Sequence, residues 1–412
     1  MRRRAALVVV LTVGLWSLVR WVIYAFPQLG DTRVYQHAVR MIDAGFVPYR
    51  DFDIEYPPLA TAAFWLIDRV PGPPTLVFSF AMCAALAASA VAALVLAQML
   101  SLSRARTILA VGGTIALPIL LGTLLQTRYD LLLTALLAWM TVAAVSRRFG
   151  WMWTLAALAT AIKLVPVFLV PVLIIWHWRH RGTRKAAIGL GAFSAGVAAT
   201  FIPFILIAPS GIWQLFAYHL ERPLQMESLG SSLIHGLGLP FEQVQSYGSD
   251  NIDGRWPQAA ATLSTLLLLV AIAVIALLLL RLTRREPDIR HLTAAVAATL
   301  LACVVFGKVV SPQYLAWLVP MVLVVPGTGG AAAATMMTLS LPITQLVFPL
   351  MYRDLVERSA PLPVALLVIR NLLLVGALAA TLWVLVREAG APAAERTRRR
   401  SASSDADAIM SG

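Results

Sequence analysis

The stretch WMWTLAALATAIKLVPVFLVPVLIIWHW (Trp151–Trp178) is apolar almost from end to end, and Lys163 is its only Lys, Arg, Asp or Glu. Arg147 and Arg148 precede the stretch, and the basic run RHRGTRK follows it. Basic loops stay on the cytoplasmic side of a membrane, so both ends of this stretch are predicted to lie on that side. We therefore interpret it as two short helices that meet near Lys163 and Pro166, and not as a single span.

Apolar segments of this kind recur along the whole chain, in which 59% of residues are hydrophobic and 13% are charged. Apolar runs of about 18 residues or more are typical of transmembrane helices. Further candidate spans are Ala5–Phe26, Pro74–Leu100, Thr107–Leu125, Leu131–Val145, Ala186–Ala208, Gln258–Leu282, Leu292–Phe306, Tyr314–Pro326, Gly329–Phe348 and Pro363–Val386. The composition predicts an all-α integral membrane protein, a helical bundle with about 10–12 transmembrane segments.

The distribution of charge predicts the orientation of the chain. In this topology 20 of the 33 Lys and Arg residues lie in inner loops or termini, whereas 14 of the 20 Asp and Glu residues lie in outer loops. Both termini are therefore predicted to be cytoplasmic, and the start MRRR with Ala5–Phe26 is interpreted as a retained signal anchor. Basic inner loops that face anionic lipid heads explain the net charge of +13, so no nucleic-acid partner is needed.

Residues 1–386 are predicted to form a single transmembrane domain. The remaining segment, 387–412, lacks apolar periodicity and is predicted to be a disordered cytoplasmic tail. Polar residues concentrate in the predicted outer loops, which are 30–74, QTRYD (126–130), 209–257, GKVVSPQY (307–314) and MYRDLVERSAP (351–361). A functional site is therefore expected on the extracytoplasmic face. Within the longest of these loops, residues 242–256 are polar and are expected to form a flexible flap.

The first outer loop contains a short helical pattern. Residues 31–42 place Val34, Ala38, Met41 and Ile42 on one apolar stripe, which predicts a helix in the membrane interface. Asp31 stands at the start of this helix. A carboxylate there can accept backbone N–H bonds and complement the helix dipole, and the residues alone favour this capping role over catalysis.

The same loop continues with DFDIEYPPLA (51–60), in which two prolines follow an acidic run. Pro57 and Pro58 cannot continue a helix but can begin one, so a rigid corner is predicted, with a new helix starting near Leu59. Asp51 and Asp53 are interpreted as solvated loop charges. Glu55 lies nearest the corner.

Four stretches together resemble a known family: GDTRVY with PYRDFDIEYPPLA, then RYD, then IKLVPVFLVP, and finally GKVVSPQYLAWLVP. In this order they are similar to the actinobacterial polyprenol-phosphate-dependent membrane mannosyltransferases of glycosyltransferase family 87, within the GT-C superfamily. The resemblance implies a GT-C-like bundle in the plasma membrane. It also implies transfer of a sugar, with mannose expected, from a polyprenyl-phosphate donor to a lipid-linked or polysaccharide acceptor on the outer face.

The resemblance reverses the preference at Asp31, because GT-C enzymes use an acidic residue just after the first helix as general base. A carboxylate can accept the proton of the acceptor hydroxyl, and direct displacement inverts the anomeric carbon. The lipid phosphate leaves as an anion, so it needs positive charge and neither a metal nor a cofactor. Donor- or acceptor-binding residues are predicted at Glu55, Tyr56, Arg128, Asp130, Lys163, His219, Arg222, Glu227, Lys308, Gln313 and Tyr314.

Several of these residues have a simpler interpretation. Lys163 can snorkel to the interface, and His219 can be a plain interface residue. Arg128 and Asp130 are favoured as an ordinary loop ion pair, and Lys308 can belong to a short connecting turn. A transporter or flippase of lipid-linked sugars is the alternative function, because charges within apolar runs and broken helices are also typical of transporters.

Overall fold

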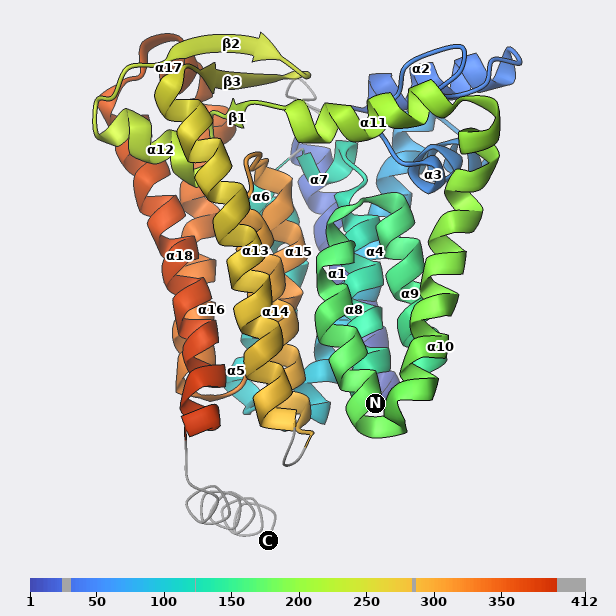
Figure 1. Ribbon diagram of the computed structural model, residues 1–412, viewed down its shortest axis with the longest axis vertical. Coiled ribbons are helices and arrows are strands. Elements are labelled where there is room, and N and C mark those ends of the chain that lie inside the picture. The colour runs from blue at the N-terminus through green and yellow to red at the C-terminus, as the bar shows by residue number, and fades with distance from the viewer. Residues whose placement is uncertain (24–30, 123, 284–286, 391–412) are drawn as a thin grey trace, which may run out of the picture.

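The computed structural model describes residues 1–23, 31–122, 124–283 and 287–390. These residues form a bundle of helices that carries short helices and a small β-sheet across one end (Figure 1). We call this end the sheet end. The first helix begins and the last helix ends at the opposite end, which we call the terminal end (Figure 1). Residues 391–412, which make up most of the predicted tail (387–412), lie outside the described residues.

The long helices of the bundle are α1 (Arg2–Ile23), α4 (Pro74–Met99), α10 (Val170–Ile207), α13 (Arg255–Thr283), α16 (Gly327–Gln345) and α18 (Pro361–Gly390). Shorter helices between them are α5 (Arg104–Ile115), α6 (Leu117–Leu121), α7 (Leu124–Thr127), α8 (Asp130–Val145), α9 (Phe149–Ile162), α14 (Ile289–Val305) and α15 (Leu315–Val322). The sheet end carries α2 (Thr32–Asp43), α3 (Pro58–Asp68), α11 (Pro209–Glu221), α12 (Leu229–Gly236) and α17 (Tyr352–Arg358), with strands β1 (Leu224–Gln225), β2 (Glu242–Ser246) and β3 (Ser249–Asp253).

The fold is that of an all-α polytopic membrane protein, as predicted. Among the described residues, six helical segments are long and apolar enough to cross a membrane, and α3, α8, α9 and α14 are shorter apolar helices. The most apolar 18-residue stretch of α13 has a mean hydropathy of 3.1, yet only 17% of that stretch is buried. Such an apolar outer surface needs a lipid surrounding. By contrast, α14 and α15 are buried almost throughout and form the centre of the bundle.

The predicted break near Lys163 and Pro166 is confirmed. α9 ends at Ile162, Lys163 has an extended backbone, and a one-turn helix (Val165–Leu169) leads into α10. α10 is itself interrupted at Gly182, where φ is +81° and ψ is 169°. A Cβ on Gly189 would lie 2.9 Å from Nδ1 of His177, so the chain reverses direction at Gly182. α10 therefore has a first arm (170–181) and a second arm (183–207).

The expected flexible flap is wrong, because residues 242–253 form a β-hairpin. β3 pairs with both β2 and β1 in antiparallel register, which gives the order β1-β3-β2. Tyr247 and Gly248, both with positive φ, form the two-residue turn that is typical of tight hairpins. Ile252 of β3 is fully buried, and its register partner Leu224 on β1 is buried beside it. This buried pair anchors a segment that is otherwise polar.

The helix predicted at residues 31–42 is present as α2, but its buried face differs from the expected stripe. Tyr35, Ala38 and Val39 are buried, whereas Val34 is 48% exposed. The Tyr35 ring stacks on Phe64 of α3 with ring centroids 4.1 Å apart, so an aromatic contact sets the rotation of the helix. α3 begins at Pro58, as the double proline predicted.

We predict that Gly189→Ala destabilises the protein by about 1–3 kcal/mol, because the new methyl group would collide with the Trp153 indole and crowd His177. The melting temperature in detergent measures the effect. Gly191→Ala is the matched control, since a Cβ there meets no atom within 4 Å. Equal melting temperatures for the two variants would show that α9 and α10 are not packed this closely.

Candidate functional site

Asp31 and Arg128 form an ion pair at the sheet end. Asp31 is the residue before α2, and its backbone carbonyl accepts the Tyr35 N–H at 3.1 Å, but its side chain makes no capping hydrogen bond. Instead, Oδ1 of Asp31 lies 3.5 Å from Nη2 of Arg128. The Asp31 side chain is 29% exposed. The carboxylate is therefore directed at a cation and remains accessible, which the capping interpretation does not explain.

The surroundings of Asp31 raise the pKa of its carboxyl group above the usual range. Burial is the largest cause, and the negative charges of Glu55 and Asp130 add to it. Arg128, and to a smaller extent Lys163, act in the opposite direction. A partly desolvated carboxylate with a raised pKa is a better proton acceptor than an ordinary surface aspartate.

Asp130, the first residue of α8, is buried and pairs with Lys163 at the break between α9 and α10. Its Oδ1 accepts a hydrogen bond from Lys163 Nζ at 2.8 Å and another from Trp317 Nε1 at 3.0 Å. The ammonium also lies over the rings of Tyr129, Tyr314 and Trp317, between 4.6 and 5.1 Å from their centroids. The predicted loop ion pair of Arg128 with Asp130 is therefore wrong, since the two neighbours have different partners. The Lys163 side chain does not snorkel outward to the membrane interface but binds Asp130 inside the bundle.

Glu55 lies between Asp31 and α11. Its charge raises the pKa of Asp31 on one side. On the other side, burial chiefly raises the pKa of Tyr218, and the Glu55 carboxylate raises it further. Burial and the charge of Arg222 lower the pKa of His219, while Glu55 opposes them. The structure thus brings Glu55 and His219 into one polar region with Asp31.

Tyr56 lies beneath this region, in an aromatic cluster. Its ring is 8% exposed and makes edge contacts with Tyr35, Phe64 and Tyr129 at centroid distances of 5.4–5.5 Å. Its carbonyl accepts a hydrogen bond from the Tyr49 hydroxyl at 2.6 Å. Tyr56 therefore forms the floor under the acidic residues, and its ring faces the core.

Among the residues that the structure describes, Arg222 and Lys308 donate hydrogen bonds to neutral groups. Arg222 follows α11 and donates from Nη2 to Oγ of Ser249 at 2.8 Å. Lys308 donates from Nζ to the carbonyl of Leu220 at 2.8 Å, and burial lowers its pKa. Within the described residues, ion pairs offset the charges of Arg128, Lys163 and Arg370, whereas none offsets Arg222 or Lys308. Of these five cations, Arg222 and Lys308 are therefore the two whose charge is left for an anionic ligand.

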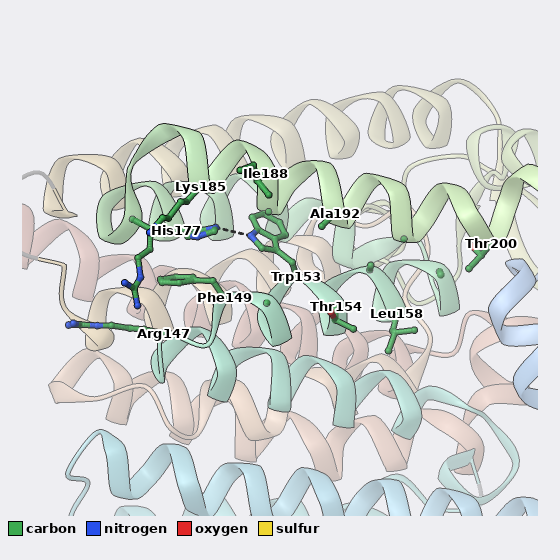
Figure 2. Close-up of a pocket in the computed structure, with 16 residues that line it drawn as sticks. Arg147, Phe149, Trp153, Thr154, Leu158, His177, Lys185, Ile188, Ala192 and Thr200 are labelled. Atoms are coloured by element: carbon green, nitrogen blue, oxygen red, sulfur yellow. Dashed lines mark hydrogen bonds between the residues drawn. The ribbon is translucent and has the colours of Figure 1, made fainter.

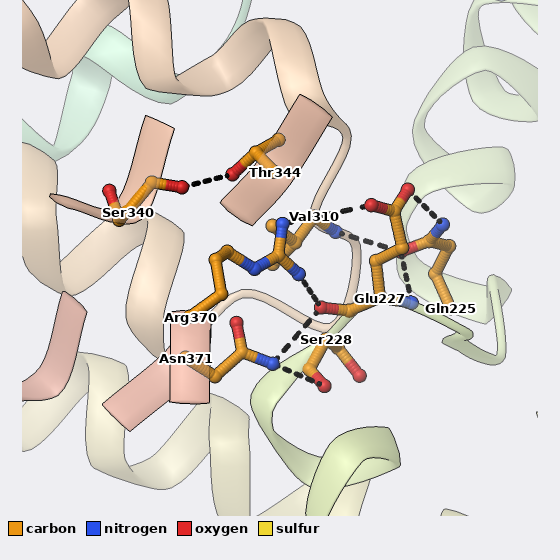
Figure 3. Close-up of polar contacts among 8 residues, drawn as sticks. All are labelled: Gln225, Glu227, Ser228, Val310, Ser340, Thr344, Arg370 and Asn371. Carbon is orange, nitrogen blue, oxygen red and sulfur yellow. Dashed lines mark hydrogen bonds and ion pairs between the residues drawn. The ribbon is translucent and has the colours of Figure 1, made fainter. Parts of the chain in front are cut away.

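Glu227 is buried against α18, where it pairs with Arg370 (Figure 3). The Arg370 guanidinium donates to the Glu227 carbonyl from Nη2 at 2.6 Å and lies 3.6 Å from the carboxylate through Nη1. Asn371 donates to the carbonyls of Glu227 and Ser228. Burial raises the pKa of Glu227 to about 7, although Arg370 lowers it. The contacts with Arg370 and Asn371 therefore anchor the turn before α12 to α18.

The last two predicted residues lie before α15. Gln313 is buried, and within the described residues its Oε1 has no hydrogen-bond partner. Tyr314 stacks on Trp317 with ring centroids 4.3 Å apart and forms one wall around Lys163. Tyr314 thus supports the Asp130–Lys163 pair from the side of α15. No group of three or more His, Cys, Asp or Glu residues within the described ranges could hold a metal ion.

Three residues that complete these contacts were not among the predicted site residues. Trp317 donates to Asp130, Tyr218 faces Glu55, and Arg370 pairs with Glu227. Arg370 had a signal, because a charge within an apolar run is costly and needs a partner. Nothing in the sequence identified Glu227 as that partner.

A sequence model described as Glycosyltransferase family 87 matches residues 54–312, which is more than half of the chain. The chain therefore belongs to glycosyltransferase family 87, and this membership favours an enzyme over a transporter. No curated protein matches the chain significantly. Most of the polar residues described above lie within the matched range, but Asp31 lies before it. The case for Asp31 therefore depends on its position and electrostatics.

We predict that Arg370→Met destabilises the protein by about 3 kcal/mol, because it leaves the buried Glu227 carboxylate without its cation. Adding Glu227→Gln should restore part of this loss. The melting temperature in detergent measures both effects. The same substitution at Arg353 is the control, since its ion pair with Glu357 is exposed and should contribute nothing measurable. A result in which Arg353→Met destabilises as much as Arg370→Met would refute the anchoring role.

Proposed function

We propose that this family 87 glycosyltransferase transfers a sugar, with mannose expected, from a polyprenyl-phosphate donor to a lipid-linked or polysaccharide acceptor. The observation that carries the proposal is the accessible Asp31 carboxylate, with its raised pKa, 3.5 Å from Arg128 at one end of a membrane bundle. A site at the end of such a bundle is at the level of lipid head groups, where a sugar on a lipid phosphate would be presented.

We assign the sheet end to the extracytoplasmic side of the plasma membrane. Both ends of the described chain, with Arg2–Arg4 near its start, lie at the terminal end (Figure 1). The turn of α10 at Gly182, with Arg179, Arg181, Arg184 and Lys185 around it, lies there too. Loops rich in Lys and Arg remain on the cytoplasmic side, so this distribution supports the assignment.

In the proposed reaction Asp31 is the general base. The acceptor hydroxyl attacks the anomeric carbon and transfers its proton to the Asp31 carboxylate. The bond from the anomeric carbon to the phosphate oxygen breaks, and its electron pair leaves with the lipid phosphate. One direct displacement of this kind inverts the configuration at the anomeric carbon. The adjacent Arg128 keeps Asp31 ionised and oriented before the acceptor arrives.

We assign the departing phosphate to Arg222 and Lys308, because their charges are not offset by ion pairs within the described residues. In direct displacement the nucleophile and the leaving group occupy opposite sides of the anomeric carbon, so the phosphate needs cations other than the one beside the base. His219 lies near Arg222, and its lowered pKa makes it a neutral hydrogen-bond donor at pH 7.

The sugar would then lie near Glu55, between the base and these cations. The charge of Glu55 raises the pKa of Asp31, and it also acts to raise the pKa values of Tyr218 and His219 on α11. A carboxylate in this position can accept hydrogen bonds from sugar hydroxyls. Asp130 and Lys163 are positioning residues in this account, since they fix the start of α8 and with it Arg128.

Asp31→Asn should lower sugar transfer from polyprenyl-phosphate mannose by about 10²–10⁴-fold, because an amide cannot accept the acceptor's proton. Transfer of radiolabelled sugar in membranes with equal amounts of each variant measures this. Asp53→Asn is the control, since this exposed carboxylate is in the same loop. If the Asp31 variant keeps its activity, the base is another residue, and Glu55→Gln is the next variant to measure.

The acid limb of the pH–rate profile should depend on Arg128. Transfer requires ionised Asp31, and the positive charge of Arg128 lowers the pKa of this carboxyl group. Arg128→Gln should therefore raise that pKa and move the acid limb of kcat to higher pH by about one unit. Arg50→Gln, in the exposed part of the same loop, should leave the limb unchanged. If the acid limb of kcat in the Arg128 variant stays in place or moves to lower pH, the group that titrates there is not Asp31.

A further inference from the structure

A groove of about 600 Å³ runs along the outside of the bundle between α9 and the second arm of α10 (Figure 2). Arg147, Lys185 and His177 lie at one end of it, and Thr200 lies at the other (Figure 2). Between these ends the lining consists largely of small or apolar residues, such as Ala157, Ala161, Ala192 and Gly196. The 15 helical steps from Lys185 to Thr200 span about 22 Å.

The basic end of the groove has a cationic cluster. Arg147, Arg181 and Lys185 line the groove there, and none of its lining residues is acidic. Within the described residues, no ion pair involves any of these three side chains. This end belongs to the terminal end of the bundle, away from Asp31 (Figure 1). Three unpaired cations beside an apolar channel are complementary to a negatively charged head group on a hydrocarbon chain.

The floor beneath the cations is fixed. Trp153 donates from Nε1 to Nδ1 of His177 at 2.9 Å, and Phe149 stacks on the His177 ring with centroids 4.1 Å apart (Figure 2). Gly189 lets the second arm approach these rings, because a side chain there would overlap Trp153. The groove is therefore part of the packed fold, with a shape that does not depend on a flexible loop.

We propose that this groove binds one anionic phospholipid, whose phosphate lies among Arg147, Arg181 and Lys185 and whose acyl chain follows the small residues toward Thr200. Basic pockets between transmembrane helices are suited to anionic lipid head groups. The groove is longer than half of the roughly 30 Å hydrocarbon core, so it can hold most of one chain. This binding site goes beyond the proposed transferase reaction and does not depend on it.

Native mass spectrometry of the purified full-length protein with phosphatidylglycerol tests the head-group contact. Each basic side chain near an anionic lipid contributes roughly a factor of five, so Arg181→Gln with Lys185→Gln should weaken retention about 25-fold. The control is Arg3→Gln with Arg4→Gln, which removes two exposed charges that do not line the groove. Arg181→Lys with Lys185→Arg keeps the charge and should keep the lipid.

A second pair of variants tests the chain contact without altering charge. Ala192→Phe fills the groove and should lower phosphatidylglycerol retention at least tenfold, whereas Ala195→Phe, exposed on the same arm but outside the lining, should not. Equal retention by all variants would overturn the proposal. So would equal retention of phosphatidylcholine and phosphatidylglycerol by the unmodified protein, or displacement of phosphatidylglycerol by an equimolar polyprenyl phosphate, which would identify the groove as a carrier-lipid site.

Discussion

The buried ion pair of Asp130 with Lys163 is the interaction on which the site depends. An isolated charge in a membrane bundle costs several kcal/mol, so each of these side chains needs the other. The 2.8 Å contact, the Trp317 hydrogen bond and the surrounding rings together offset that cost. Because the pair joins the start of α8 to the end of α9, it fixes two helix ends at one depth. The pair thereby also fixes the position of Arg128, which lies two residues before Asp130 and faces Asp31.

Features that depend on backbone chemistry could be predicted from the sequence. The break at Lys163 and Pro166 was predictable because proline removes an amide donor and a buried charge needs a cavity or a partner. The start of α3 at Pro58 was predictable for a similar reason, since proline fits the first turn of a helix. The membrane class followed from apolar runs that have no other stable surrounding, such as the exposed face of α13.

Features that depend on contacts between distant segments could not be predicted. Glu227 and Arg370 are 143 residues apart, and nothing in the sequence around either residue identifies the other as its partner. The β-hairpin at 242–253 is polar on most of its surface, so its alternating pattern was too weak to reveal the buried Ile252. The rotation of α2 was set by Tyr35 against Phe64, which a helical stripe counted on aliphatic residues alone did not include. The same limit applied to Arg128 and Asp130, whose closeness in sequence suggested a pair that tertiary contacts exclude.

Both ends of the bundle carry basic side chains that have no ion pair within the described residues. At the sheet end the cation beside Asp31 is neutralised by it, and Arg222 and Lys308 remain for an anion. At the terminal end Arg147, Arg181 and Lys185 line a groove that continues along apolar residues. The proposed reaction and the proposed phospholipid site therefore both use cations without an ion-pair partner, at opposite ends of the bundle. This separation would keep the proposed phospholipid away from the proposed lipid-linked donor.

The proposed reaction places Asp31, as the base, on one side of the sugar and the phosphate on the other. Electron cryomicroscopy of the protein with a non-transferable analogue of polyprenyl-phosphate mannose tests it most directly. We expect the anomeric carbon to face the Asp31 carboxylate, with space for one acceptor hydroxyl between them, and the phosphate to lie on Arg222 and Lys308. A phosphate bound at Arg128, or a sugar whose anomeric carbon faces Glu55 or Asp130, would rule out these roles for Asp31, Arg222 and Lys308.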